Sequence, residues 1–312
     1  MKILITDGLE AEAVASLRTS HKVDVSELDP KQLLESIPAY DGLIVRSRTK
    51  VTKEVIVRGT RLKVIGRAGV GVDNIDVLAA TSRGILVVNA PTASTTSVAE
   101  LAIGHMLSWS RHLPQADRSV KEGRWEKSEF EGRELAGKVL GLIGSGRIGA
   151  EVAKRARAFG MRVAAYDPYL NPQVAEAMGV LLVNLDQVLA ESDYLSIHAV
   201  LTDETRGMIG SAEFAKMKRS AVLVNCARGE IVQEAALAQA LKEGTIAGAA
   251  LDVFEREPPR DSPLLSLRNV VLTPHLGAST REAQARAGAI IADQVLKVLA
   301  GQKAEFVVSP PP

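Results

Sequence analysis

The sequence of 312 residues predicts an α/β fold with two doubly wound parallel sheets, and three observations support this prediction. Short apolar segments alternate with helical patterns up to about residue 98, and the alternation returns between residue 138 and about residue 275. Such alternation is typical of parallel sheets with helices on both faces. A glycine-rich turn opens the second series, and one more helical pattern follows it near the end of the chain.

The first series predicts five strands, their connecting helices and one long helix. The strands are expected at residues 3–6, 22–25, 42–46, 62–66 and 85–89. Helical patterns at residues 10–18 and 52–58 lie between them. The long helix is expected over residues 97–111, with His105 among its inward-facing residues, and Pro114 ends or kinks it.

A charged arm over residues 123–137 separates the two series. It carries Trp125 and Phe130 among many charged residues. Large apolar groups on a polar background are typical of a segment that packs on another surface. An ordinary apolar cluster within the same chain is an equally weighted alternative.

The second series predicts seven strands and a closing helix. The strands are expected at residues 139–143, 162–166, 180–183, 194–198, 221–225, 247–251 and 270–273. Asn184, Ser211 and Ser279 are expected to mark helix starts as capping residues. The last helix, over residues 280–299, is expected to stop at Gly301.

The glycine-rich turn indicates a binding function. Gly144-Ser145-Gly146-Arg147-Ile148-Gly149 follows a strand and precedes a helix over residues 150–159, as the G-x-G-x-x-G fingerprint of dinucleotide-binding folds requires. Gly144 is expected to take the tight turn, Gly146 to let a pyrophosphate approach the backbone, and Gly149 to let helix and strand pack closely. The N–H groups at the helix start then face the phosphates.

The strand that follows this helix ends in a carboxylate. Asp167 lies 18 residues after Gly149, near the spacing of about 20 at which a carboxylate binds the adenosine ribose. A carboxylate at this position repels a 2′-phosphate, so NAD rather than NADP is the expected cofactor. A simple turn at Asp167-Pro168 is the alternative.

The two series therefore predict a discontinuous arrangement of domains. Residues 99–280 are expected to form a Rossmann domain that binds the dinucleotide. Residues 1–98 and 281–312 are expected to form a flavodoxin-like domain that binds the substrate. The last helix is assigned to the flavodoxin-like domain, because each of the two domains needs a helix to complete it.

Composition excludes several classes of function. The formal net charge is +1 and only 4% of residues are aromatic, so neither nucleic acid nor membrane is an expected partner. No apolar run approaches the ~18 residues of a membrane span, and the N-terminus does not read as a signal peptide. Cys226 is the single cysteine, which favours a reducing compartment and a cytoplasmic location. No metal site is predicted.

Three polar groups follow strands of the second series, at the sheet edge where ligands of open α/β sheets bind. They are Arg228, the acidic segment from Asp252 to Glu257, and His275. A solvated arginine, a charged surface loop and a structural histidine are the ordinary alternatives. Hydride transfer needs this combination: a histidine near neutral pKa takes the hydroxyl proton, a carboxylate orients it, and an arginine holds a substrate carboxylate.

These stretches resemble the D-isomer-specific 2-hydroxyacid dehydrogenases over nearly the whole chain, most closely the branch that oxidises phosphoglycerate. The likeness is strongest at residues 66–74, 144–149, 225–229, 252–257 and 274–280. It implies two α/β domains with a cleft between them, and a homodimer, or a higher homo-oligomer, formed through the dinucleotide domains. Position by position, Arg228, Glu257 and His275 match the catalytic arginine, glutamate and histidine of the family.

The resemblance also implies contacts to cofactor and substrate. Besides the three glycines of the fingerprint, cofactor contacts are expected at Arg147, Ile148, Asp167, Ala199, Cys226, Ala227, Arg228, Asp252, His275, Gly277 and Ala278. Substrate contacts are expected from Arg46, Arg67, Val70 and Gly71, with Arg48 as a further cation and a solvated basic loop as the alternative. Two departures from the family pattern, Ala199 without a hydroxyl and Val70 in place of a frequent threonine, are expected to loosen cofactor binding.

The expected function is NAD-dependent oxidation of 3-phospho-D-glycerate to 3-phosphohydroxypyruvate, the first step of serine synthesis. A glyoxylate or hydroxypyruvate reductase, or another D-2-hydroxyacid dehydrogenase, is the nearest alternative. A dinucleotide-sensing, corepressor-like interaction protein is the alternative from another class. Only a few residues follow Gly301, so feedback control through a C-terminal regulatory domain is not expected.

Overall fold

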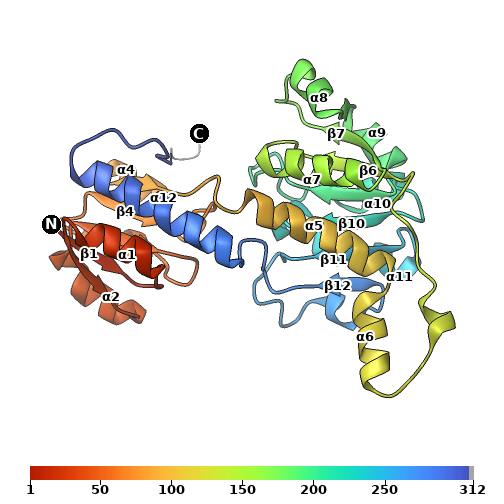
Figure 1. Cartoon of the computed structure of the whole chain (residues 1–312), viewed down its shortest axis with the longest axis horizontal. Coiled ribbons are helices and arrows are strands. Elements are labelled where there is room, and N and C mark those ends of the chain that lie inside the picture. The colour runs from red at the N-terminus through yellow and green to blue at the C-terminus, as the bar shows by residue number, and fades with distance from the viewer. Residues whose placement is uncertain (309–312) are drawn as a thin grey trace. The chain divides into compact units, whose positions relative to one another are not determined.

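The computed structural model describes residues 1–308 and divides into two compact units (Figure 1). Unit 1 comprises Met1–Ser94 together with the segment from Ala278 onward, and unit 2 comprises Thr95–Gly277. These boundaries lie a few residues from those expected for the two domains. The chain therefore leaves unit 1, completes unit 2 and returns to unit 1.

Unit 1 is a five-stranded parallel sheet covered by helices on both faces. Its strands are β1 (Lys2–Ile5), β2 (Lys22–Val25), β3 (Gly42–Val45), β4 (Val64–Arg67) and β5 (Leu86–Val88). The spatial order β2-β1-β3-β4-β5 is that of flavodoxin-like folds. The predicted fold class of this half is confirmed.

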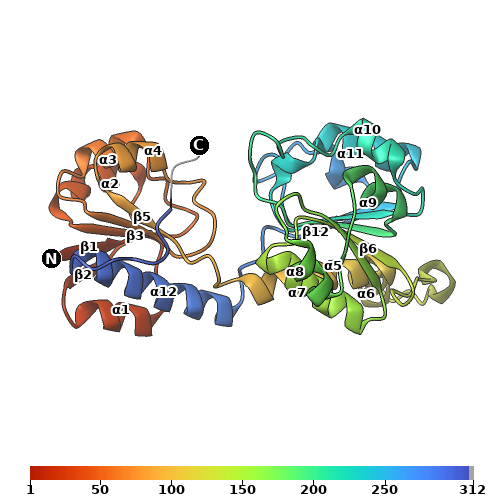
Figure 2. The same cartoon turned by 90° about the horizontal axis from the view of Figure 1, so that it is seen from above.

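The helices of unit 1 form two layers (Figure 2). They are α1 (Ala11–Arg18) and α12 (Arg281–Leu299) on one face, and α2 (Pro30–Ser36), α3 (Lys53–Arg58) and α4 (Val77–Ser82) on the other, with the 3-10 turn η1 (Ile37–Ala39) after α2. Gly66 lets α12 lie close against β4, because a Cβ atom there would stand 2.9 Å from Val295 and 3.0 Å from Ile291. The closing helix thus returns to the first sheet, as the sequence predicts.

Unit 2 is a seven-stranded parallel sheet with the order β12-β11-β10-β9-β6-β7-β8. The strands are β6 (Val139–Ile143), β7 (Arg162–Tyr166), β8 (Leu181–Leu182), β9 (Tyr194–Ile197), β10 (Val222–Asn225), β11 (Gly248–Leu251) and β12 (Val270–Leu272). All seven predicted strands form, with small differences at their ends. The order reverses at β6, which is the switch point of a Rossmann fold and the position of the glycine-rich turn.

The helices of unit 2 also cover both faces of the sheet (Figure 2). They are α5 (Thr95–Ser110), α6 (Leu113–Lys121), α7 (Arg147–Ala158), α8 (Pro172–Met178), α9 (Leu185–Glu191), α10 (Ser211–Lys216) and α11 (Glu234–Glu243), with 3-10 turns η2 (Lys127–Phe130), η3 (Gly229–Ile231) and η4 (Pro263–Ser266). Helices α5 and α7 contribute to the apolar core on one face, and α9, α10 and α11 to the core on the other. In residues 1–308, no helix is both long and apolar enough to cross a membrane.

Three details of the helices differ from expectation. Pro114 does not simply end a helix but lies in the first turn of α6, where its missing N–H is not needed. Gly210, not Ser211, caps α10, and Ser211 is its first helical residue. Thr280, not Ser279, caps α12, because its side chain accepts a hydrogen bond from the N–H of Ala283. The predicted cap at Asn184 is confirmed by its bond from the Gln187 N–H.

The arm of residues 123–137 packs only in part on its own unit. Leu135 belongs to the buried core of unit 2, and the Phe130 ring lies 6.5 Å from the ring of His112. Trp125, in contrast, is 84% exposed. The cluster within the chain therefore accounts for Leu135 and Phe130 but not for Trp125.

Candidate active site

The glycine-rich loop has the geometry that its sequence predicts. Gly144 has a φ of +84°, and a Cβ atom there would stand 2.7 Å from the backbone nitrogen of Ala199. A Cβ atom at Gly149 would stand 2.5 Å from the carbonyl oxygen of Gly144, so this glycine lets α7 start close to β6. At Gly146 no atom lies within 4 Å of the Cβ position. The loop is therefore tight at its two ends and open in the middle, which fits a pyrophosphate.

Asp167 lies beside this loop at the end of β7. Its Oδ2 accepts a hydrogen bond from the N–H of Ser145 at 2.7 Å, and its Oδ1 accepts one from the N–H of Tyr169 at 3.0 Å. Each carboxylate oxygen can accept more than one hydrogen bond, so both retain capacity for ribose hydroxyls. The bond from Ser145 fixes the carboxylate next to the phosphate loop, and nothing in the sequence pattern indicates it.

The other expected cofactor contacts in unit 2 lie at the carboxyl ends of the strands or the start of α7. Arg147 is exposed at the helix start, and Ile148 is partly buried against the core. Ala227 donates its N–H to Asn225 Oδ1 at 3.0 Å. Cys226 is buried, and burial raises the pKa of its thiol, so it is not a reactive nucleophile.

His275 and Glu257 form a hydrogen-bonded pair. His275 Nδ1 lies 2.7 Å from Glu257 Oε2, and the two side chains are 50% and 38% exposed. The backbone fixes the histidine, because its N–H donates to the carbonyl of Asp252 at 2.9 Å and its φ of 54° lies in the left-handed region. Since Nδ1 is engaged with Glu257, Nε2 is the nitrogen that remains for a substrate.

Gly229, which follows Arg228, lets the Arg228 loop approach the loop that carries Glu257. A Cβ atom at Gly229 would stand 1.9 Å from the carbonyl carbon of Phe254, so only glycine allows these two loops to approach. The carbonyl of Arg228 accepts a bond from Asn225 Nδ2 at 2.9 Å, which anchors the segment to the end of β10. We call Arg228, Glu257 and His275 the acid–base cluster.

The charges within the acid–base cluster perturb one another. The hydrogen bond that His275 donates to Glu257 raises the pKa of His275 above its ordinary value, against the opposing effects of burial and Arg228. Burial by itself would raise the pKa of Glu257, but hydrogen bonds from His275 and the Phe254 N–H, with the charge of Arg228, hold it below its usual value. The pair is thus a histidine of raised basicity backed by an ionised carboxylate.

Asp252 holds the turn that carries His275. This residue is 1% exposed. Its Oδ1 accepts bonds from Thr273 Oγ1 at 2.5 Å and from the Leu276 N–H at 2.7 Å, and its Oδ2 accepts one from the Gly277 N–H at 2.8 Å. Asp252 therefore has a positioning role besides the cofactor contact expected of it. Ala278, the next expected contact along the chain, falls in unit 1.

In unit 1, acidic side chains already pair with two of the arginines expected near a substrate. Arg46 Nη2 lies 2.7 Å from Glu10 Oε1, and its Nη1 donates to Gln284 Oε1. Arg48 donates to Glu27 at 2.8 Å and to Asp7 at 3.3 Å. We call Arg46 and Arg48 with these four partners the arginine network. The sequence shows the two cations but not their pairing.

The remaining expected substrate contacts lie in the loop after β4. Arg67 donates from Nη1 to the carbonyl of Ala68 at 3.2 Å, and its guanidinium lies over Gly69, whose missing side chain leaves room for it. Val70 and Gly71 are partly buried, and the Val70 carbonyl accepts a bond from Asn89 Nδ2 at 2.6 Å. The roles of these residues stay predictions.

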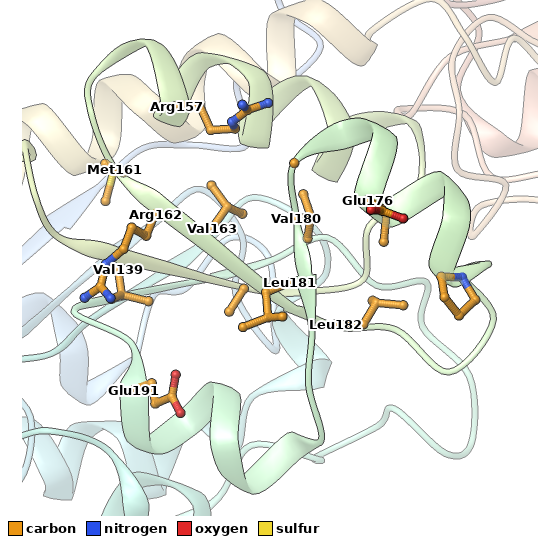
Figure 3. Close-up of a pocket in the computed structure, with 14 residues that line it drawn as sticks. Val139, Arg157, Met161, Arg162, Val163, Glu176, Val180, Leu181, Leu182 and Glu191 are labelled. Carbon is orange, nitrogen blue, oxygen red and sulfur yellow. The ribbon is translucent and has the colours of Figure 1, made fainter.

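A pocket in unit 2 lies apart from these residues. It has a volume of about 640 Å³ and is lined by β7, β8 and α8 (Figure 3). Val163, Val180 and Leu182 give it an apolar wall, with Arg157 and Glu176 among the charged residues around it. None of the predicted site residues lines this pocket. Among residues 1–308, no group of three or more potential ligands is arranged to hold a metal ion.

Comparisons with known proteins identify relatives of this chain. Residues 103–277 match the model of the D-isomer specific 2-hydroxyacid dehydrogenase, NAD binding domain. The chain is 55% identical over 313 residues to the D-3-phosphoglycerate dehydrogenase of Methanocaldococcus jannaschii and 51% identical over 314 residues to that of Archaeoglobus fulgidus. Each alignment covers 100% of this chain and 60% of the relative, so the chain spans about 60% of the length of these relatives.

Solved structures show the same architecture along the whole chain. A protein of Thermus thermophilus superimposes with a TM-score of 0.91 at 36% identity, covering 99% of this chain and 100% of the other. A glyoxylate reductase from Paecilomyes thermophila superimposes with a TM-score of 0.90 at 31% identity, covering 99% and 98%.

The chain belongs to the D-isomer specific 2-hydroxyacid dehydrogenase family. The predicted resemblance, the Rossmann-type fold and NAD as the cofactor of the matched domain are confirmed. The relatives of highest identity quoted above are both D-3-phosphoglycerate dehydrogenases. The roles of individual site residues stay predictions.

Proposed function

We propose that the protein oxidises 3-phospho-D-glycerate to 3-phosphohydroxypyruvate with NAD, as the first step of serine synthesis. The main support is the 2.7 Å hydrogen bond between His275 and Glu257, with Arg228 beside it, on a domain that belongs to the NAD-binding family. The names of relatives that share 51–55% of the sequence support the phosphorylated substrate.

The acid–base cluster supplies the groups that this oxidation requires. His275 takes the hydroxyl proton at Nε2, because its Nδ1 is held by Glu257. Glu257 keeps the imidazole oriented and stabilises its protonated form. Arg228 binds the substrate carboxylate and polarises the carbonyl as it forms. NAD, when bound, would supply the acceptor for the hydride.

The residues that hold the cofactor follow from the fit of the glycine-rich loop. The open backbone at Gly146 and the N–H groups at the start of α7 receive the pyrophosphate. Asp167 binds the adenosine ribose through the lone pairs that Ser145 and Tyr169 leave available. Further contacts are proposed at Arg147, Ile148, Ala199, Cys226, Ala227, Asp252, Gly277 and Ala278.

Substrate recognition is proposed for Val70, Gly71, Arg46 and Arg67 of unit 1. The backbone N–H groups of Val70 and Gly71 receive the carboxylate, and the two guanidinium groups receive the phosphate. Because Arg46 already pairs with Glu10 and Gln284, phosphate binding by Arg46 requires exchange of at least one of these partners.

A substrate panel tests the proposal. Turnover of 3-phosphoglycerate, D-glycerate, D-lactate, hydroxypyruvate and glyoxylate is followed through nicotinamide absorbance. Arg67→Ala and Arg46→Ala are expected to raise KM for 3-phosphoglycerate at least about tenfold, as loss of a charge-assisted hydrogen bond should. Arg61→Ala, which removes another ion-paired arginine of unit 1, is the matched control. Unchanged KM in both test variants would make the phosphate assignment wrong.

A reductase of glyoxylate or hydroxypyruvate is the second candidate. The observation that favours it is the engagement of Arg46 by Glu10 and Gln284, which leaves the phosphate site with less cationic character than the sequence indicates. Faster turnover of the unphosphorylated acids in the panel would select this candidate. Tight NAD binding without turnover of any acid would favour the interaction protein instead.

We infer that the protein is a cytoplasmic homodimer. Trp125 at 84%, Val120 at 56% and Leu113 at 51% exposure present large apolar groups along α6 and the arm, a pattern typical of an interface. The single, buried cysteine suits a reducing compartment. Trp125→Ser is expected to lower the dimer fraction in light scattering. A monomeric wild-type protein at micromolar concentration would contradict the proposal.

A further inference from the structure

A buried histidine lies behind the acid–base cluster. His105 of α5 is 2% exposed, and its Nε2 lies 3.0 Å from Thr273 Oγ1. The same Thr273 hydroxyl lies 2.5 Å from Asp252 Oδ1. Asp252, in turn, accepts the N–H groups of Leu276 and Gly277. A continuous chain of hydrogen bonds therefore runs from His105 to the two residues that follow His275.

The direction of these hydrogen bonds fixes the tautomer of His105. The Thr273 hydroxyl donates its single proton to Asp252 Oδ1. The oxygen of Thr273 then accepts from His105, which places the proton of the neutral imidazole on Nε2. The other nitrogen, Nδ1, is buried and has no hydrogen-bond partner in the described residues. A second proton there would be a buried donor without an acceptor.

The surroundings of His105 argue against a role in packing alone. Its neighbours on α5, such as Ala102 and Met106, belong to the apolar core of unit 2. A leucine would fill such a position without the cost of burying a polar ring, so the hydrogen bond to Thr273 is what offsets the burial of the imidazole. Burial also lowers the pKa of His105, so the ring stays neutral near pH 7.

We propose that His105 is a positioning residue, which acts through Thr273 and Asp252 to hold the turn that presents His275 to Glu257. The bond from His105 restricts rotation of the Thr273 hydroxyl that donates to Asp252. Asp252 then keeps the N–H groups of Leu276 and Gly277 in place. The inference rests on the proposed function only for the catalytic role of His275, since the hydrogen-bond chain itself is independent of activity.

Two variants separate positioning from packing. His105→Leu keeps an apolar side chain of similar size and removes the donor. His105→Gln retains an N–H donor that reaches toward Thr273. Ser110→Ala on the same helix is the matched control, because it removes a different buried hydrogen bond, the one between Ser110 and Tyr194. It tests whether any loss of stability in α5 has the same effects.

The first measurements use the protein without substrate. Nitrogen-15 NMR of wild type is expected to show a protonated Nε2 and a bare Nδ1 at His105. In His105→Leu, hydrogen exchange at the Leu276 and Gly277 amides is expected to accelerate about tenfold, and the pKa of His275 is expected to fall toward its ordinary value. His105→Gln and Ser110→Ala are expected to stay close to wild type in both. A protonated Nδ1 in wild type, or unchanged exchange in His105→Leu, would overturn the proposal.

Kinetics then test the effect on the reaction. In His105→Leu, kcat is expected to fall about threefold to tenfold, as loss of one neutral hydrogen bond should allow. The pH at which the oxidation rate reaches half its maximum is expected to fall with the pKa of His275, and His105→Gln is expected to restore both. If the exchange results hold but no 2-hydroxy acid is turned over, the proposed function fails and the positioning role stands.

Discussion

The acid–base cluster of unit 2 and the arginine network of unit 1 hold charged groups in different ways. In the acid–base cluster, backbone groups fix the loops: the His275 N–H bonds to Asp252, and Gly229 lies against Phe254. In the arginine network, side chains hold side chains: Arg46 pairs with Glu10, and Arg48 pairs with Glu27. The first arrangement is set by the fold, and the second depends on partners that are far away in the sequence.

This difference shows which sequence patterns are informative about function. A group placed by backbone geometry keeps its role wherever the local motif recurs, so a motif predicts its position well. A cation placed by ion pairs has a net effect that depends on its partners, and a count of arginines does not show whether acidic side chains already neutralise them. Mutations that affect each region separately can test this distinction.

The largest effect is expected from His275→Asn. Asparagine keeps a hydrogen-bonding side chain of similar reach but cannot take a proton, so turnover is expected to fall about 10²- to 10⁴-fold. NAD affinity, measured by fluorescence titration, is expected to stay within a few-fold of wild type. His21 of unit 1, which is partly exposed, serves as control through His21→Asn. Near-normal turnover would remove His275 from the mechanism.

Gly229→Ala tests whether the backbone sets the acid–base cluster. The new Cβ atom would meet the Phe254 carbonyl carbon at 1.9 Å, so the two loops must separate. Turnover is expected to fall by up to about 10²-fold through displacement of Arg228, and unfolding free energy by about 1–3 kcal/mol. Gly104→Ala on α5 is the control, because no atom lies within 4 Å of its Cβ position. Equal behaviour of both variants would show that the loop approach is not required.

Glu257→Gln is expected to shift the pH dependence of oxidation. His275 must be unprotonated to act as base, so the rate of oxidation rises with pH through its pKa. Glu257 raises that pKa, so removal of the charge is expected to move the rising part of the pH–rate profile toward lower pH. The measurement is kcat/KM against pH between 5 and 9. A pH profile that stays unchanged, or that shifts toward higher pH, would contradict the pairing of Glu257 with His275.

The smallest effect is expected from Arg48→Ala. Its side chain is 52% exposed and pairs with Glu27, which is 77% exposed, so solvent and salt screen this ion pair. Its second partner, Asp7, keeps hydrogen bonds from the N–H groups of Arg46 and Thr49. The melting temperature is expected to change by less than about 2 °C, and KM for 3-phosphoglycerate is expected to stay the same. A clear rise of this KM with the phosphorylated acid alone would make Arg48 part of substrate recognition.

The strands and the glycine-rich turn could be predicted because local patterns determine them. Each predicted strand is a short apolar run, and its burial in a parallel sheet follows from that run. The turn from Gly144 to Gly149 needs small residues at fixed positions, so sequence alone identifies it. Helix α6 is not predicted from the sequence, because a proline suits the first turn of a helix as well as the end of one.

The interactions that the sequence did not reveal are side-chain contacts over long separations. The pairing of Arg46 with Glu10 and Gln284 joins three segments of the chain. The contact between His105 and Thr273 is similar, since His105 appears in the sequence only as an inward-facing residue of a helix. Such contacts depend on tertiary packing, and a single sequence contains no local pattern for them.

The return of α12 to the first sheet has a consequence for synthesis of the chain. Ile291, Val295 and Leu299 of this helix are buried in the core of unit 1. A ribosome delivers residues 1–94 first, yet their sheet lacks this cover until the final segment emerges. The half that is translated first is therefore the last to finish folding. A nascent chain that has emerged only as far as Gly277 would have a complete unit 2, while in unit 1 the sheet face under α12 would be covered by α1 alone.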